Sequence, residues 1–229
     1  MSTAQNPSLS RPDLREQVLR SAPILLIDEH EPFLPIRVGV TVFETTAPSP
    51  SFPRTIEVDP DKVKLVIEYA IYYDYDIQHL YDLEHVWVYL GHDGEVVTAE
   101  CSFHGQYMIG VLSDRSNLTA DGRVQLYVQP GKHAMTPLAE LFRLLPNAIA
   151  VNQELAGKDG LLEPDMFKGE FKFGPDDDKL ADEHLQRFRF LPSFSYSPYT
   201  WEDGHLVSWD ELREEIPVRL RALMKTLRS

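Results

Sequence analysis

Residues 63–94 carry the clearest strand pattern of the chain and read VKLVIEYAIYYDYDIQHLYDLEHVWVYLGHDG. In the first part of this stretch, apolar residues recur at every second position and many are Val, Ile or Tyr. That composition favours a half-buried strand over residues 62–73. Val63, Val66 and Ala70 would also fit a helix, but the segment holds few strong helix formers.

Further strands are predicted on both sides of this one. The next covers residues 82–90 and ends near the Asp93-Gly94 step, which supplies the positive φ of a tight hairpin turn. A third strand returns over residues 95–104, and apolar residues alternate again over residues 124–128. Four strands so close in sequence predict an antiparallel sheet. Nearer the start of the chain, strands are expected at residues 22–27 and 38–42, and a loop at the proline-rich residues 47–53.

Helices are predicted outside the strands. Ser208 and Glu211 have the spacing of a capping box, which predicts a C-terminal helix that Pro217 interrupts or kinks. Three shorter helices are expected near residues 14–19, at residues 137–146 with Thr136 as the cap, and near residues 180–188.

The predicted fold is mainly β with peripheral helices, in the α+β class: an antiparallel β-sandwich with a C-terminal helix. A chain of 229 residues lies within the range in which a sandwich folds as one unit, and its hydrophobic fraction of 43% suffices for a core. We expect an N-terminal extension over residues 1–21 and a single β-sandwich domain over residues 22–229.

Charge and cysteine usage restrict the partners and the compartment. The net charge of -14, from 36 acidic and 22 basic residues, argues against a nucleic-acid groove or an anionic membrane surface. The single cysteine, Cys101, cannot form an internal disulfide and fits a reducing compartment. Residues 1–17 lack the apolar run of a signal peptide, and no stretch is long enough for a transmembrane helix. We expect a cytoplasmic protein, and the oligomeric state stays open.

Carboxylates gather around the start of the second strand, at Asp74, Asp76, Asp82 and Glu84. Side chains alternate along a strand, so Asp82 and Glu84 should project from one face about 7 Å apart. Like charges that close destabilise the sheet unless a cation or a hydrogen-bond donor lies between them. His79, in the preceding turn, could supply a nitrogen ligand. The alternative is an acidic strand end that faces water.

Other histidines follow at strand ends. His104 ends the polar face of the third strand, and His133 lies in a glycine-containing loop, where side chains can converge on a site. Each alone is more often structural, and His85 and His92 are expected to have a surface or packing role. The acidic run at residues 176–178 lacks the spacing of an EF-hand loop and is interpreted as a solvated face.

Four short motifs resemble proteins of known fold. Residues 79–84, HLYDLE, have the His-x-x-Asp-x-Glu spacing of the necrosis- and ethylene-inducing peptide-like proteins, secreted cytolysins that bind a divalent cation in a β-sandwich. Residues 102–105, SFHG, resemble the Ser-x-His-Gly element of that family. Residues 131–134, GKHA, and 31–35, EPFLP, resemble elements of vacuolar-protein-sorting-type relatives. The likeness covers residues 22–137.

The resemblance implies one divalent cation with a defined set of protein ligands. Oxygen-rich ligation suits Mg, Ca or Mn, and added histidines shift the preference toward Fe, Zn or Mn. The implied ligands are His79, Asp82 and Glu84 with an upstream aspartate, Asp76 or Asp74, and with His104 and His133 near the cavity. We count His133 among the expected ligands as well.

Two functions are open. In the first, a metal-dependent enzyme of hydrolytic or acid–base type acts on a small molecule or conjugate, with His133 or His104 as the base. Two histidines and a carboxylate could also hold ferrous iron, so a non-haem iron oxygenase is a further alternative. The missing export signal favours an enzyme.

The second function is a module that binds a sugar or lipid head group through the cation and breaks no bond, as the resemblance implies. A metal with an open coordination position in a closed cavity would favour catalysis, whereas an open rim would favour binding. Aromatic side chains that could stack on a sugar are Tyr72, Tyr73, Tyr75, Tyr81, Trp87 and Trp201.

Overall fold

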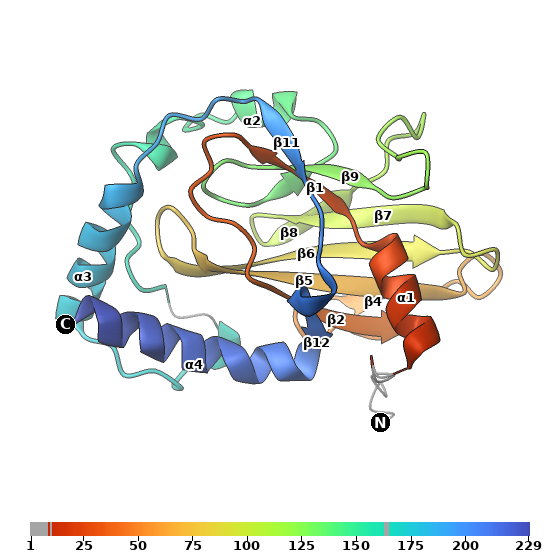
Figure 1. The fold of residues 1–229 in the computed structure, drawn as a ribbon, viewed down its shortest axis with the longest axis horizontal. Coiled ribbons are helices and arrows are strands. Elements are labelled where there is room, and N and C mark those ends of the chain that lie inside the picture. Colours follow the sequence, from red (N-terminus) through yellow and green to blue (C-terminus); the bar gives the residue numbers. More distant parts are fainter. Residues whose placement is uncertain (1–8, 10, 163–164) are drawn as a thin grey trace.

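The computed structural model describes residues 9, 11–162 and 165–229, and its strands form two main sheets (Figure 1). The larger sheet has the order β12-β2-β5-β6-β7-β8 and the smaller has the order β10-β9-β1-β11. The larger sheet consists of β12 (Leu206–Ser208), β2 (Arg37–Phe43), β5 (Leu65–Tyr75), β6 (Leu80–Leu90), β7 (Val96–Phe103) and β8 (Gln106–Ile109). The smaller sheet consists of β10 (Met135–Thr136), β9 (Gln125–Val128), β1 (Ile24–Asp28) and β11 (Tyr196–Tyr199), and β3 (Ala47–Pro48) pairs separately with β4 (Thr55–Ile56).

Helices surround the sheets. The α-helices are α1 (Pro12–Ser21), α2 (Glu140–Arg143), α3 (Pro175–Leu185) and α4 (Trp209–Leu227). Short 3-10 helices lie at Ala150–Asn152, Asp165–Phe167, Gln186–Phe188 and Asp203–His205. The expected β-sandwich with peripheral helices and a C-terminal helix is confirmed. In the described part of the chain, none of the helices has the length and apolar character needed to cross a membrane.

The main core lies between the two sheets. Alternate residues of β5 and β6 point toward the smaller sheet, where they meet apolar side chains such as Leu25 of β1 and Leu126 of β9. Helix α1 adds Leu14 and Val18 to this core, and the hydroxyl of Tyr69 donates to the carbonyl oxygen of Val18 at 2.7 Å. The predicted extension over residues 1–21 lies partly outside the described residues, and the domain division stays a prediction.

Helix α4 packs against the opposite face of the larger sheet. Trp209 and Leu212 share a buried cluster with Tyr72 of β5, and a Cβ at Gly39 of β2 would lie 2.9 Å from Leu212 Cδ2. The predicted capping box is confirmed, with the Ser208 side chain accepting the backbone N–H of Glu211. We predicted that Pro217 interrupts or kinks the helix; the helix continues through this buried residue, so an interruption is wrong. Tertiary packing of the apolar face compensates for the missing backbone donor.

Several strand and helix predictions are corrected by the structure. The sandwich is not purely antiparallel, because β1 pairs in parallel with β9 and β12 pairs in parallel with β2. The strand at residues 124–128 therefore belongs to the smaller sheet, and β8 was not predicted. The helix expected at residues 137–146 is only Glu140–Arg143, and Thr136 ends strand β10, although its hydroxyl accepts the backbone N–H of Leu138 at 3.3 Å as predicted.

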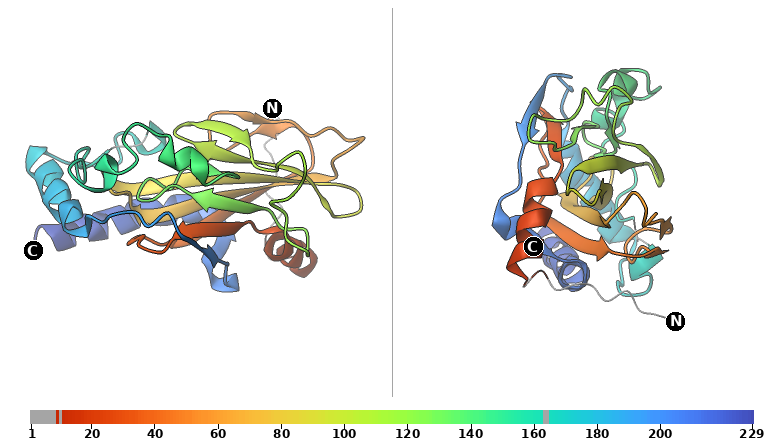
Figure 2. Two further views of the ribbon diagram at one scale, coloured as in Figure 1. Left: turned by 90° about the horizontal axis from the view of Figure 1, so that it is seen from above. Right: turned by 90° about the vertical axis from the view of Figure 1, so that its right-hand side faces the viewer.

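Turns from both sheets meet at one end of the sandwich. The β5–β6 turn and α3 lie at this end, and α1 lies toward the other (Figures 1 and 2). Because β5 and β6 pair with Tyr73 opposite Asp82 and Ile71 opposite Glu84, both acidic side chains share the face that the core cluster occupies. The predicted common face of Asp82 and Glu84 therefore points into the gap between the sheets.

Candidate metal centre

The candidate site is built by the β5–β6 turn of the larger sheet and the β9–β10 turn of the smaller one. The backbone N–H of Ile77 donates to the carbonyl oxygen of Gly131 at 2.8 Å, which joins the two turns directly. The N–H of Gly131 donates to Oε2 of Glu31 at 2.6 Å, which adds the loop after β1. Gly131 has φ +71°, and a Cβ there would lie 2.0 Å from Asn152 Oδ1, so only glycine fits this contact.

His133 and Asp82 form the central pair of the site. Nδ1 of His133 lies 3.1 Å from Oδ2 of Asp82, and the imidazole stacks on the ring of Tyr73 with centroids 3.8 Å apart. Burial acts to lower the pKa of His133, but the hydrogen bond to Asp82 and the nearby carboxylate of Glu31 raise it to about 10. Burial likewise acts to raise the pKa of Asp82, and the bond and charge of His133 outweigh it and lower this pKa. The two residues are therefore an ion pair at neutral pH.

Asp76 and Lys132 form a second pair beside the first. The Lys132 ammonium lies 2.7 Å from one carboxylate oxygen of Asp76 and 2.8 Å from the other. Asp76 also accepts a hydrogen bond from the backbone N–H of Gln78 at 2.7 Å. Aspartate side chains commonly make this bond to the backbone two residues further along a turn. Nε2 of His79 lies 3.8 Å from Asp76. Asp76 thus connects the turn, the lysine and the predicted histidine ligand.

Glu84 lies deeper between the sheets than Asp82. It accepts a hydrogen bond from the hydroxyl of Ser102, which in turn accepts the backbone N–H of His85 at 2.6 Å. Burial and the negative charge of Asp82 raise the pKa of Glu84 to about 8. Glu84 is therefore mostly neutral at pH 7 and is held by Ser102 rather than by a charge partner.

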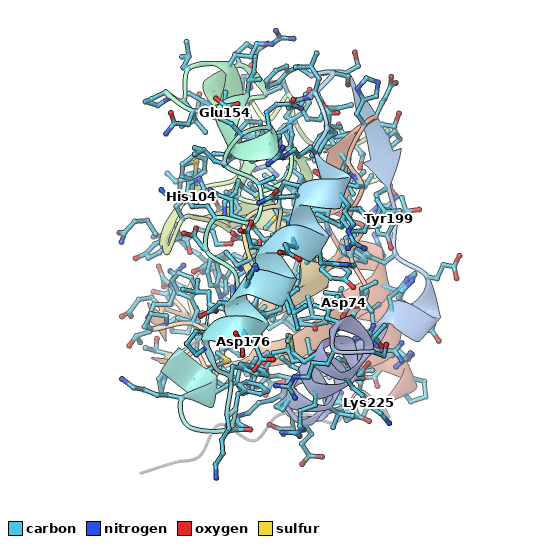
Figure 3. The ribbon with its side chains drawn as sticks, turned by 90° about the vertical axis from the view of Figure 1, so that its left-hand side faces the viewer. Asp74, His104, Glu154, Asp176, Tyr199 and Lys225 are labelled. Atoms are coloured by element: carbon cyan, nitrogen blue, oxygen red, sulfur yellow. The ribbon has the colours of Figure 1, made fainter. Side chains whose placement is uncertain are left out.

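The other predicted site residues lie in separate places. Asp74 forms a two-point ion pair with Arg219 of α4 at 2.9 and 2.7 Å, so Asp76 is the upstream aspartate that faces the site. Nε2 of His104 lies 2.8 Å from Oε1 of Gln129, within hydrogen-bond distance. Figure 3 looks onto this end of the sandwich, with His104 and Asp74 on either side of α3.

Sequence reasoning missed two charged residues of the site. Lys132 stands directly before His133, and Glu31 opens the EPFLP segment, yet neither was given a role. The adjacency of Lys132 to a predicted ligand was a usable signal. The proximity of Glu31, about a hundred positions from Gly131 in the chain, follows only from how the strands are arranged.

The donor set fits a divalent cation. Asp76, Asp82 and His133 each offer a ligand atom within 4.8 Å of the others. Two carboxylates and an imidazole suit Mg, Mn, Fe or Zn. Nε2 of His133 is buried and makes no hydrogen bond among the described residues, and it lies 3.7 Å from the carboxylate oxygen Oε1 of Glu31. A cation bound by Asp76 would take the position that the Lys132 ammonium holds.

A pocket of about 400 Å³ adjoins the cluster through Lys132. Its walls combine the ammonium of Lys132, the imidazole of His104 and side-chain amide groups, which can donate hydrogen bonds to hydroxyl or phosphate oxygens. The principal lining residues are Gln78, His104, Gln129, Lys132, Leu145 and Asn147.

No family model and no curated protein sequence matches the chain. Solved structures do match parts of it. A structure of "NLPPya in complex with glucosamine" is 16% identical, with 54% of this chain and 67% of that chain covered and a TM-score of 0.37. A structure of "NLPPya in complex with mannosamine" is 14% identical, with 83% of this chain and 95% of that chain covered and a TM-score of 0.35. A structure described as "Toxin fold as basis for microbial attack and plant defense" is 16% identical, with 58% and 81% covered and a TM-score of 0.34. These proteins are necrosis- and ethylene-inducing peptide-like toxins, the group that the motifs at residues 79–84 and 102–105 resemble.

Proposed function

We propose that this protein is a binding module that uses one divalent cation to hold a sugar or lipid head group. The observation that supports this most directly is the gathering of Asp76, Asp82 and His133 beside a polar pocket. Such a cation supplies positive charge that attracts hydroxyl or phosphate oxygens of a ligand. The pocket supplies directional donors, so recognition needs no bond-breaking step.

The side chains of the three-residue cluster and of the adjoining pocket have distinct tasks in this proposal. Asp76 and Asp82 hold the cation through oxygen, and His133 holds it through nitrogen after losing its proton. Lys132, released from Asp76, is free to pair with a phosphate or to donate to a hydroxyl. Gln78 and Gln129, which line the same pocket, orient the ligand through their amide groups.

The metal-dependent enzyme expected from the sequence is the weaker candidate. A general base needs a free lone pair, but His133 is paired with Asp82 without the cation and would give its nitrogen to the cation in the loaded protein. His104 shares a hydrogen bond with Gln129 outside the three-residue cluster. A ferrous facial triad needs two imidazoles, and the cluster found among the described residues contains one.

Metal binding is tested by calorimetric titration of protein purified without added metal, with Ca, Mg, Mn and Zn in turn. We expect one ion per chain and a loss of at least about a hundredfold in affinity, or about 2.8 kcal/mol, for Asp82→Asn. Asp74→Asn is the matched control, because Asp74 pairs with Arg219 instead. Equal affinity in the Asp82→Asn variant and the parent would reject the site, provided that circular dichroism shows both to be folded.

Ligand binding is tested on the cation-loaded protein with glucosamine and phosphocholine as probes. We expect binding that disappears after chelation and weakens in Gln129→Ala, whose side chain lines the pocket. A protein that binds the cation but neither probe would keep the metal site and contradict the head-group function. A probe that the loaded protein cleaves would instead favour the enzyme.

A further inference from the structure

A second buried polar cluster lies on the other face of β5 and β6. Its centre is Glu68, which is fully buried. The carboxylate accepts hydrogen bonds from Ser49 Oγ at 2.6 Å, Ser51 Oγ at 2.7 Å and Trp87 Nε1 at 2.6 Å. His85 joins this cluster, with Nε2 at 3.0 Å from Ser51 Oγ. Because side chains alternate along β6, His85 and the cation-site residue Glu84 point to opposite faces.

When both serines donate to the Glu68 carboxylate, the hydrogen bonds of the cluster assign the proton on the His85 ring. Ser49 Oγ accepts the backbone N–H groups of Ser51 and Phe52 at 3.2 and 3.0 Å, so its own hydrogen goes to Glu68. The hydrogen of Ser51 also goes to Glu68. Ser51 Oγ is then an acceptor toward His85, which places the imidazole hydrogen on Nε2. Nδ1 of His85 is left with a bare lone pair.

That lone pair is buried and unused. Nδ1 of His85 has no hydrogen-bond partner in the described part of the chain, and only 2% of the residue is exposed. Native proteins seldom leave a buried polar atom in this state.

His85 also lines a pocket of about 480 Å³. Apart from His85 and the two serines, its walls are largely apolar, with Pro50, Phe52, Pro53, Leu83 and Met166 among them. Phe52 lies edge-on to the imidazole with ring centroids 5.1 Å apart. The pocket is therefore lined mainly by apolar side chains and Tyr81, and one of its lining residues, His85, carries a buried acceptor that has no hydrogen-bond partner among the described residues.

We propose that this pocket binds a small neutral molecule with an aromatic body and a single hydroxyl or N–H group, which donates to Nδ1 of His85. The apolar walls hold the ring, and the acceptor selects for the donor. Because Nδ1 is buried, the ligand reaches it through a small shift of the 49–53 loop that carries Phe52. The pocket lies on the opposite face of β5 and β6 from the cation cluster, and its ligand needs no metal ion.

The proposal is tested with phenol and toluene, which have nearly the same shape but differ in the donor. In protein labelled with ¹⁵N-histidine, we expect the bare Nδ1 tautomer of His85 without ligand and a shift of that nitrogen resonance on adding phenol. We expect phenol to bind at least about tenfold more tightly than toluene. Equal binding of the two, or phenol binding with no change at His85 Nδ1, would overturn the proposal, as would no binding of phenol at about 10 mM.

Two variants separate the acceptor from the cavity. His85→Phe is expected to remove the preference for phenol over toluene, whereas His92→Phe, at an exposed histidine bound to the Pro60 carbonyl, should keep it. Leu83→Trp fills the pocket without altering His85 and should abolish binding of both probes. A preference that survives His85→Phe, or binding that survives Leu83→Trp, would contradict the proposed site.

Discussion

The ammonium of Lys132 lies 2.7 Å from the carboxylate of Asp76, so a turn of the smaller sheet supplies positive charge to the acidic turn of the larger one. Together with protonated His133 and neutral Glu84, this pair balances most of the negative charge at the site. From the sequence we expected a cation or a hydrogen-bond donor between the crowded carboxylates. In the structure the chain provides its own cation, Lys132, at the carboxylate of Asp76, and a metal ion bound there would have to displace it.

Lys132→Met should therefore raise the affinity for a divalent cation. Removing the competing ammonium leaves Asp76 free to bind the ion, and we expect a gain of about tenfold in the association constant, or about 1.4 kcal/mol. Calorimetric titration of the purified variant with Mn measures the change. Lys158→Met, at an exposed lysine, is the control and should leave the affinity unaltered. Unchanged or weaker affinity in Lys132→Met would show that Lys132 does not compete with the ion.

The same Lys132→Met substitution should lower stability when no cation is present. It leaves the nearly buried carboxylate of Asp76 without its charge partner. Breaking a buried ion pair in this way lowers the free energy of unfolding by about 3–5 kcal/mol. Added cation should restore much of the loss, because ligand binding to the folded state stabilises it. Urea unfolding with and without Mn measures both effects. A loss that Mn does not reverse would argue that the ion binds away from Asp76.

Gly131→Ala should disrupt the contact between the two turns. The backbone of the alanine would have to keep φ +71°. Its Cβ would lie 2.0 Å from Asn152 Oδ1 and 2.8 Å from Ile77 Cγ2. Gly94→Ala is the matched control, because Gly94 has φ +83° but no atom within 4 Å of the added carbon. We expect Gly94→Ala to cost about 1–2 kcal/mol from backbone strain and Gly131→Ala to cost clearly more. Similar unfolding free energies for the two variants would mean that the close packing at Gly131 is unimportant.

The strands were well predicted from the sequence because the alternation of apolar and polar side chains along a strand involves only neighbouring residues. Strands β5, β6 and β7 and the shared face of Asp82 and Glu84 all follow from a period of two. The capping box at Ser208 is equally local. Those predictions needed no knowledge of which strand lies beside which.

What the sequence could not provide depends on long-range arrangement. The parallel pairing of β1 with β9 joins segments a hundred positions apart, and nothing in either segment identifies its partner. The choice between Asp74 and Asp76 was open for the same reason, since it is decided by Arg219 and Lys132. The cytoplasmic location and the role of each site residue stay predictions.

Glu84→Gln should flatten the dependence of stability on pH. Folded Glu84 keeps its proton up to about pH 8, whereas in the unfolded chain it loses the proton near its ordinary pKa of 4.5. Its contribution to stability is therefore fully present below pH 4.5 and is lost as the pH rises through 8, by up to about 1.4 kcal/mol per pH unit. Urea unfolding at several pH values should show this decline in the parent and in Glu57→Gln, an exposed control, but less of it in Glu84→Gln. Parallel pH profiles for all three proteins would contradict the assignment.

Cation affinity should rise with pH because the imidazole of His133 must lose its proton before its nitrogen can bind an ion. The pKa of His133 is about 10 in the cation-free protein, so below that pH each bound ion releases up to one proton from this residue. The logarithm of the association constant is then expected to rise by up to about one per pH unit between pH 6 and 8. Titrations with Mn in buffers of different ionisation enthalpy measure the protons released. His133→Asn should bind more weakly and release about one proton fewer per ion, while His92→Asn should match the parent. If parent and His133→Asn release the same number of protons, the ion does not bind through His133, and Asp76 and Asp82 alone would have to hold it.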